Sequence, residues 1–215
     1  MPDLHFRVEG AEAIPFAATP LLSFSLRLRN ATPEPIHSVA LRCQIRLDPT
    51  RRDYSPQEQD LLRDLFGDPS RWSRTVRGML WTLADVMVPS FTGETVVGLP
   101  VPCTFDFNVA VTKYFAALGD GEVPLLLLFS GTVFYEDEEG QLRVGRVSWE
   151  REAPFRLPVR TWRELMDHHY PNSAWLCLDR DTFDRLHRYK VAQGVPTWEQ
   201  ALDRLLSLAE QERAK

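Results

Sequence analysis

The stretch VPLLLLFSGTVFYEDEEGQLRVGRVSW (residues 123–149) decides the fold class. An apolar, β-branched run over 123–135 is followed by four acidic residues and a glycine, and then by period-two alternation over 142–149. This pattern predicts an antiparallel β-hairpin. The first strand is apolar at every position from Leu125 to Phe129, so we expect it to be covered on both faces, by the fold or by a partner. The mixed second strand is expected near the sheet edge.

Period-two alternation of apolar and polar residues recurs on both sides of this hairpin and predicts further strands. Turn-forming proline, glycine and asparagine residues separate these runs, which favours antiparallel neighbours. The prediction is an α+β protein of mainly β structure: an antiparallel β-sandwich of about eight strands, with an immunoglobulin-like arrangement as one form of it. The further strands are expected over residues 4–8, 22–29, 36–47, 79–87, 95–109 and 153–159. Residues 80–87 fit either a strand or a buried helical turn, and the strand over 95–109 is expected to be interrupted at residues 98–102.

Two helices are expected between these strands. The tetrapeptide SPQE at residues 55–58 places serine at an N-cap, proline at the first helical position and glutamate at the third. This capping box predicts a helix over residues 56–66. Apolar residues at helical spacing predict a second inserted helix over residues 109–118.

The composition becomes helical after residue 159. Thr161, with a glutamate three residues later, is the expected N-cap of one helix, and Thr197 is that of another. We therefore divide the chain into a β-sandwich body with inserted helices (1–159) and a helical C-terminal extension (160–215). No low-complexity linker separates the two parts, so we expect the extension to pack on the body.

Charge and hydropathy exclude several classes of protein. A formal net charge of −5 creates no field that would attract a phosphate backbone, so we expect no nucleic-acid partner. Apolar runs are far shorter than the roughly 20 residues of a membrane span. The N-terminal residues carry acidic side chains and lack the apolar core of a secretory signal, so we expect a cytoplasmic protein.

Asp167, His168 and His169 contain the one pair of adjacent histidines in the chain. Imidazoles beside a carboxylate could bind a metal or perform acid–base chemistry. A helical zinc site, however, places its histidines four residues apart, whereas adjacent residues on a helix point in different directions. Histidines in the last turn of a helix also interact favourably with its negative end. Both interpretations stay open.

Trp149, Trp162 and Trp175 lie in the last third of the chain and are candidates for binding a partner. Exposed indoles on a sandwich would suggest a partner or a glycan, and indoles between sheet and helices would be core. The scattered cysteines Cys43 and Cys103, together with Cys177, lack the spacing of a zinc site, so we expect free thiols.

Motifs of the common enzyme classes do not occur in this sequence. It contains no GxSxG, no glycine-rich phosphate loop and no GxGxxG. We therefore assign no catalytic or cofactor-binding residue and expect no cofactor.

Three segments carry a resemblance to a known family: PIHSVALRCQIRL (35–47), VPLLLLFSGTVFY (123–135) and PVRTWRELMDHHYPNSAWLCL (158–178). They resemble a family of uncharacterised bacterial proteins, mainly from actinobacteria, classed as a domain of unknown function. The resemblance implies an association with nickel–iron hydrogenase gene clusters. It carries over no functional residue.

The sequence favours a non-catalytic accessory or scaffold protein that docks a partner protein or associates with itself. The resemblance implies that the process is hydrogenase maturation or assembly. One alternative is a metal-dependent enzyme or metal-binding protein that uses Asp167, His168 and His169. A second alternative is a glycan-binding β-sandwich.

Overall fold

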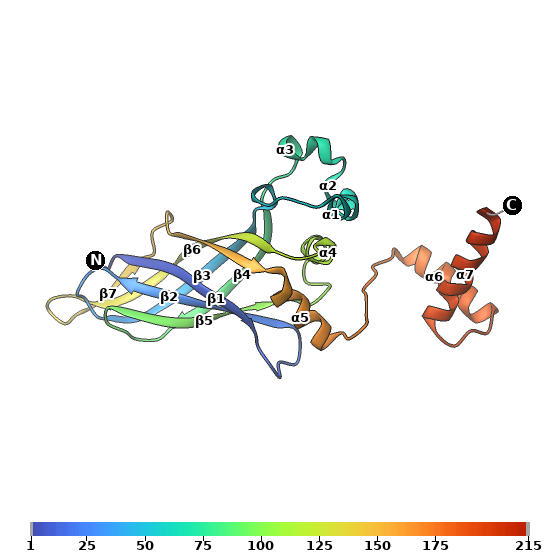
Figure 1. The fold of residues 1–215 in the computed structure, drawn as a ribbon. Coiled ribbons are helices and arrows are strands. Elements are labelled where there is room, and N and C mark those ends of the chain that lie inside the picture. The colour runs from blue at the N-terminus through green and yellow to red at the C-terminus, as the bar shows by residue number, and fades with distance from the viewer. Residues whose placement is uncertain (1, 214–215) are drawn as a thin grey trace. The chain divides into compact units, whose positions relative to one another are not determined.

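The computed structural model describes residues 2–213, which belong to two compact units, residues 1–173 and 174–215. The first unit is an antiparallel β-sandwich with helices, and the second is a pair of helices (Figure 1). Within residues 2–213, no helix combines the length and the apolar character that crossing a bilayer requires.

Two antiparallel sheets form the body. One has the strand order β1-β2-β5, and the other has the order β4-β3-β6-β7, with β8 also paired to β6. The strands are β1 Leu4–Ala13, β2 Leu21–Asn30, β3 Ile36–Leu47, β4 Met79–Val88, β5 Glu94–Pro102, β6 Glu122–Glu136, β7 Leu142–Arg146 and β8 Glu152–Pro158. The predicted mainly β, antiparallel sandwich is confirmed.

Alternation along the strands builds a core between the two sheets. In β3, every second residue from Val39 to Leu47 is buried while its neighbours are partly or fully exposed. Phe24 of β2 meets Trp81 of β4 edge to face, with ring centroids 6.2 Å apart, so the inner faces of the two sheets are in contact. The buried residues of both sheets form one hydrophobic cluster, as burial of one face of each sheet requires.

The predicted central hairpin is present as β6 and β7, in register from Thr132 paired with Arg146 to Glu136 paired with Leu142. β7 lies at the edge of its sheet, as expected. Along β6, inward residues such as Leu127 are buried, whereas Leu126 is only half-buried. The outer face of this strand is therefore less covered than its apolar run predicts.

Helices gather at the end of the sandwich opposite the β6–β7 hairpin (Figure 1). The Ser55 side chain accepts from the Glu58 amide and the Glu58 carboxylate accepts from the Ser55 amide, so the predicted capping box is present. The helices of the body are α1 Pro56–Leu61, α2 Arg63–Phe66, α3 Trp72–Thr75, α4 Val109–Ala117 and α5 Val159–His169, with 3₁₀ turns at Pro49–Arg51 and Pro69–Arg71.

Several predicted boundaries differ from the structure, and two of these differences have a clear local cause. The strand expected over 95–109 ends at Pro102, because a turn closed by the Phe107 amide and the Thr104 carbonyl follows it. The turn leads to Asn108, whose side chain caps α4 and donates to the carbonyls of Leu80 and Trp81. Thr161 is not an N-cap, since α5 begins at Val159 directly after β8. There the Val159 amide donates to the Gly121 carbonyl at 2.8 Å, which attaches the helix start to the body.

The two compact units divide after Ser173, whereas the sequence pattern places the division after residue 159. The difference is α5, whose residues Trp162, Leu165 and Met166 are buried in the core of the first unit. The packing of the remaining helices on the body stays a prediction.

We expect Gly131→Ala to destabilise the protein by about 3 kcal/mol, because an added Cβ would lie 2.2 Å from the Ala40 carbonyl oxygen in the centre of the sheet. Urea unfolding of the purified chain measures this change. Gly10→Ala is the matched control: no atom lies within 4 Å of its added Cβ, so its effect should stay below about 1 kcal/mol. Equal losses in both variants would contradict the close-approach argument.

Candidate functional site

The predicted metal residues lie in the last turn of α5. Asp167 and His168 are exposed, and His169 is half-buried. The two ring nitrogens of His169 face the backbone carbonyl oxygens of Leu165 at 3.0 Å and Ala17 at 3.2 Å. Within residues 2–213, no three His, Cys, Asp or Glu side chains gather as metal ligands would. His169 instead links the helix end to the loop after β1.

The three tryptophan candidates occupy different environments. Trp162 is 6% exposed and stacks on Phe115, with ring centroids 5.0 Å apart, so it belongs to the core. Trp149 follows β7 and is 83% exposed. Trp175 lies in the second unit and is partly exposed.

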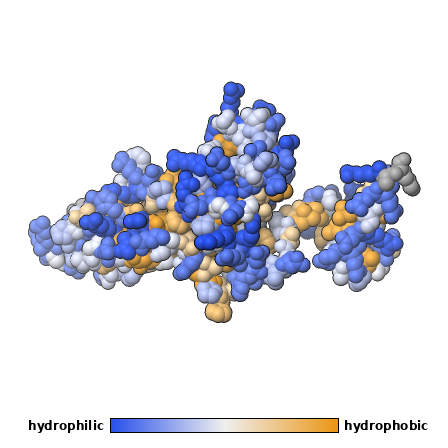
Figure 2. Space-filling view, viewed as in Figure 1, coloured by the Kyte–Doolittle hydropathy of each residue, from blue (hydrophilic) through white to orange (hydrophobic). Residues whose placement is uncertain are grey.

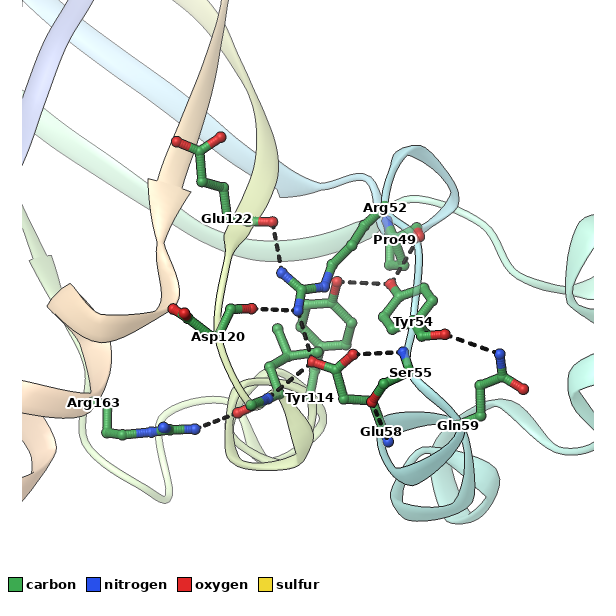
Figure 3. A network of polar contacts seen from close by, with 12 residues as sticks. Pro49, Arg52, Tyr54, Ser55, Glu58, Gln59, Tyr114, Asp120, Glu122 and Arg163 are labelled. Carbon is green, nitrogen blue, oxygen red and sulfur yellow. Dashed lines mark hydrogen bonds and ion pairs between the residues drawn. The ribbon is translucent and has the colours of Figure 1, made fainter.

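A buried polar network joins the inserted helices to the start of β6 (Figure 3). The guanidinium of Arg52 donates to Glu58 at 2.7 Å and to the carbonyls of Asp120 and Glu122 at 2.5 and 2.9 Å. The side chains of Arg52 and Glu58 are only 9% and 10% exposed. The Nε of Arg52 is buried without a hydrogen-bond partner among the described residues, and the guanidinium carbon lies 5.7 Å from the Tyr54 ring centroid.

Glu58 is the residue on which this network converges. Its two oxygens accept from the amides of Ser55 and Gly119, each at 2.9 Å, as well as from Arg52. Burial by itself would raise the pKa of the Glu58 carboxyl, but these donors stabilise the carboxylate, and together they lower the pKa. The lowered pKa means that the folded state favours the charged form.

Two tyrosines complete the network. The Tyr54 hydroxyl donates to the Pro49 carbonyl at 2.8 Å, so the Tyr114 hydroxyl, also 2.8 Å away, donates to Tyr54. Burial raises the pKa of both phenols, which keeps them neutral. The hydrogen bonds of the network connect the segment before α1, the chain after α4 and the start of β6.

Sequence patterns reveal only one part of this network, the capping box of Ser55 and Glu58. The Arg52 contacts with the carbonyls of Asp120 and Glu122 span 68 and 70 residues of sequence. No local pattern predicts such contacts.

The second unit consists of α6 Arg180–Ala192 and α7 Trp198–Arg213. Asp179 caps α6 by accepting from the Thr182 amide at 2.8 Å, and Thr197 accepts from the Gln200 amide at 3.3 Å at the start of α7. The N-cap predicted at Thr197 is therefore confirmed. Gly194, with φ of 65°, permits the turn between the helices.

Aromatic contacts hold the two helices together. The ring of Phe183 on α6 lies 5.4 Å from that of Trp198 on α7, and the Lys190 ammonium lies 5.5 Å from the Trp198 ring centroid. Among residues 174–213, only Ala201 is buried. The unit thus has almost no core of its own.

Patches of exposed apolar side chains, here called the apolar surface, interrupt the mainly hydrophilic exterior of this unit (Figure 2). Leu206 is 61% exposed and Leu208 is 49% exposed. One helical turn before Leu206, Leu202 lines a hollow of about 680 Å³, which is formed by α6, α7 and the segment before α6 and also has Trp175 and Phe183 in its wall. Cys177 also lines this hollow. An apolar surface of this kind can bind apolar side chains of another molecule.

A two-sheet antiparallel sandwich with an added helical pair is the class of protein that the fold defines. Residues 1–214 match the family of unknown function DUF6084, and the chain belongs to this family. No curated protein matches the chain.

Solved structures give weak likenesses. The CARDB domain of a Pyrococcus furiosus protein, determined with di-metal ions, is 14% identical with a TM-score of 0.27, over 73% of this chain and 91% of that chain. A β-glucosidase from Kluyveromyces marxianus is 10% identical with a TM-score of 0.28, over 72% of this chain and 15% of that chain. These values carry no argument about activity.

We expect Glu58→Gln to reduce the free energy of unfolding at neutral pH by about 1–3 kcal/mol, because an amide NH₂ would face one of three hydrogen-bond donors. The lowered pKa of Glu58 contributes stability above the pKa of the unfolded carboxyl, and that contribution is lost as the pH falls through the folded pKa. The difference between wild type and variant should therefore narrow in acid, as urea unfolding between neutral and acidic pH will measure.

Asp85→Asn is the control for Glu58→Gln. Asp85 also pairs with an arginine, Arg42, but both side chains are 60% exposed. Exposed pairs contribute little to stability, so this variant should unfold like wild type. A difference for Glu58→Gln that stays constant across the pH range would disprove the assigned role of its charge.

We expect a thiol reagent at neutral pH and low protein concentration to modify one cysteine per native chain. Burial raises the pKa of the Cys43 and Cys103 thiols to about 12, so neither forms the reactive thiolate. Cys177 is exposed. Mass spectrometry should show a single adduct, three adducts after denaturation, and none on native Cys177→Ser. Rapid modification of native Cys43 or Cys103 would contradict the described core.

Proposed function

We propose that this protein is a non-catalytic accessory or scaffold protein that docks a partner protein through its helical unit. The observation that supports this proposal is the apolar surface of α6 and α7 around the 680 Å³ hollow. Large exposed apolar patches are rare on monomeric soluble proteins, and those that occur commonly mark sites where another protein binds.

The partner that fits this surface is an amphipathic helix. A groove between two helices accepts a third helix through apolar residues spaced three and four apart. The hollow itself has the volume of a small-molecule pocket. The apolar surface, however, continues beyond it to Leu206, one helical turn after Leu202, which favours an extended partner over a small molecule.

The expectations about location and cellular process are parts of this proposal, whereas metal binding and glycan binding are alternatives to it. A cytoplasmic location and a role in hydrogenase maturation or assembly, which the family resemblance implies, are parts of the proposal. Metal binding at Asp167, His168 and His169 and glycan binding at Trp149 or Trp175 stay alternative predictions. Metal analysis of protein purified without a histidine tag and a glycan array would test them.

Capture from an extract of the source organism tests the docking proposal. The full chain, carrying a short photo-crosslinker on Cys177, should form a covalent adduct with one partner chain. That partner is then purified separately, and its affinity for the unmodified full chain is measured by calorimetry. Leu206→Asp should weaken this binding at least about tenfold, because a carboxylate would enter an apolar contact.

Leu208→Asp is the matched control for the capture. It makes the same substitution on the same helix, but two residues along a helix lie about 200° apart around its axis, so Leu208 faces away from the Leu206 side. Binding should therefore be nearly unchanged in this variant. A partner that binds wild type and Leu206→Asp with equal affinity would refute docking at this surface.

A further inference from the structure

The helical unit is too small to bury its own apolar side chains. It contains 42 residues (174–215), and domains near this size usually need disulfides, metals or oligomerisation for stability. Its one cysteine, Cys177, is a free thiol. Among the described residues of this unit only Ala201 is buried, and the other apolar side chains of α6 and α7 are half-buried or exposed. The exposed ones are available for contact with a second surface.

The two helices carry opposite net charges. α6 contains four basic and two acidic residues, and α7 contains four acidic and two basic residues, with histidine taken as neutral. This complementarity stabilises the contact between α6 and α7 within one copy. If two copies associate, the same complementarity favours an arrangement of their four helices in which each α6 lies beside an α7.

We infer that the surface covering this unit is the same unit of a second copy of the chain. In a two-fold arrangement, α6 of each copy lies beside α7 of the other, and the same patch serves both copies. Each helix then has two neighbours of opposite charge, and helices of like charge lie diagonally. Four antiparallel helices with an apolar centre form a stable bundle.

The apolar residues are spaced for such a bundle. On α7, Leu202 and Leu206 are four residues apart and lie on one side of the helix, beside the hollow that Phe183 lines from α6. In the two-fold arrangement the Leu206 side of one copy fills the hollow of the other. This inference rests on the proposed docking function, and it identifies the docked amphipathic helices as α6 and α7 of a second copy.

Sedimentation velocity of the full chain over a range of concentrations tests the inference. The 24.7 kDa chain should shift from monomer to a species of twice that mass as its concentration rises. Leu206→Asp should raise the dissociation constant at least about tenfold, and Leu208→Asp should leave it nearly unchanged. Because Leu206 is exposed in one copy, its replacement should leave the helical content unchanged, as circular dichroism will verify.

Thiol modification gives a second readout that needs no variant. Cys177 lines the hollow, so a second copy should shield it, and its modification rate should fall several-fold as the wild-type concentration rises. The rate in Leu206→Asp should not depend on concentration. A wild-type chain that is monomeric throughout, or a dimer that Leu206→Asp leaves intact, would overturn the inference.

The result distinguishes this inference from the proposed function. If the chain is monomeric and Leu206→Asp abolishes capture of a different partner chain, the docking function holds and the two-fold association is wrong. If the chain is monomeric and capture is the same for wild type and Leu206→Asp, both are wrong.

Discussion

The pairing of β3 with β6 is the constraint on which the body depends. β3 lies between β4 and β6, and β6 in turn pairs with β7 and β8 along its other edge. Gly131 marks the closest approach of the two strands, where the carbonyl of Ala40 occupies the space that a side chain would need. Because these strands supply much of the core, their register determines which side chains face the opposite sheet.

The buried network around Glu58 performs a comparable role for the helices. A carboxylate removed from water is costly unless hydrogen bonds replace its hydration. Glu58 obtains them from the α1 N-terminus, from the chain after α4 and from Arg52, which also binds carbonyls at the start of β6. One side chain therefore connects three segments that are distant in sequence, and it is suited to fixing the helical end of the sandwich.

The helical unit has the opposite character. The body encloses its apolar side chains between two sheets, whereas α6 and α7 expose most of theirs. Two helices that touch along one line can bury only the residues on that line, here Ala201 and the partly covered aromatic rings. The apolar surface left exposed is the physical reason why the proposed docking site is placed in this unit.

Local patterns in the sequence determined the strands, the central hairpin and the Ser55–Glu58 capping box, because alternation and capping depend on residues a few positions apart. They could not determine that α5 belongs to the body, since Trp162 meets Phe115 only after the chain has folded. Nor could they connect Arg52 with the start of β6, or show that Trp162 is core while Trp149 is exposed. These features depend on contacts between segments tens of residues apart, which tertiary packing alone decides.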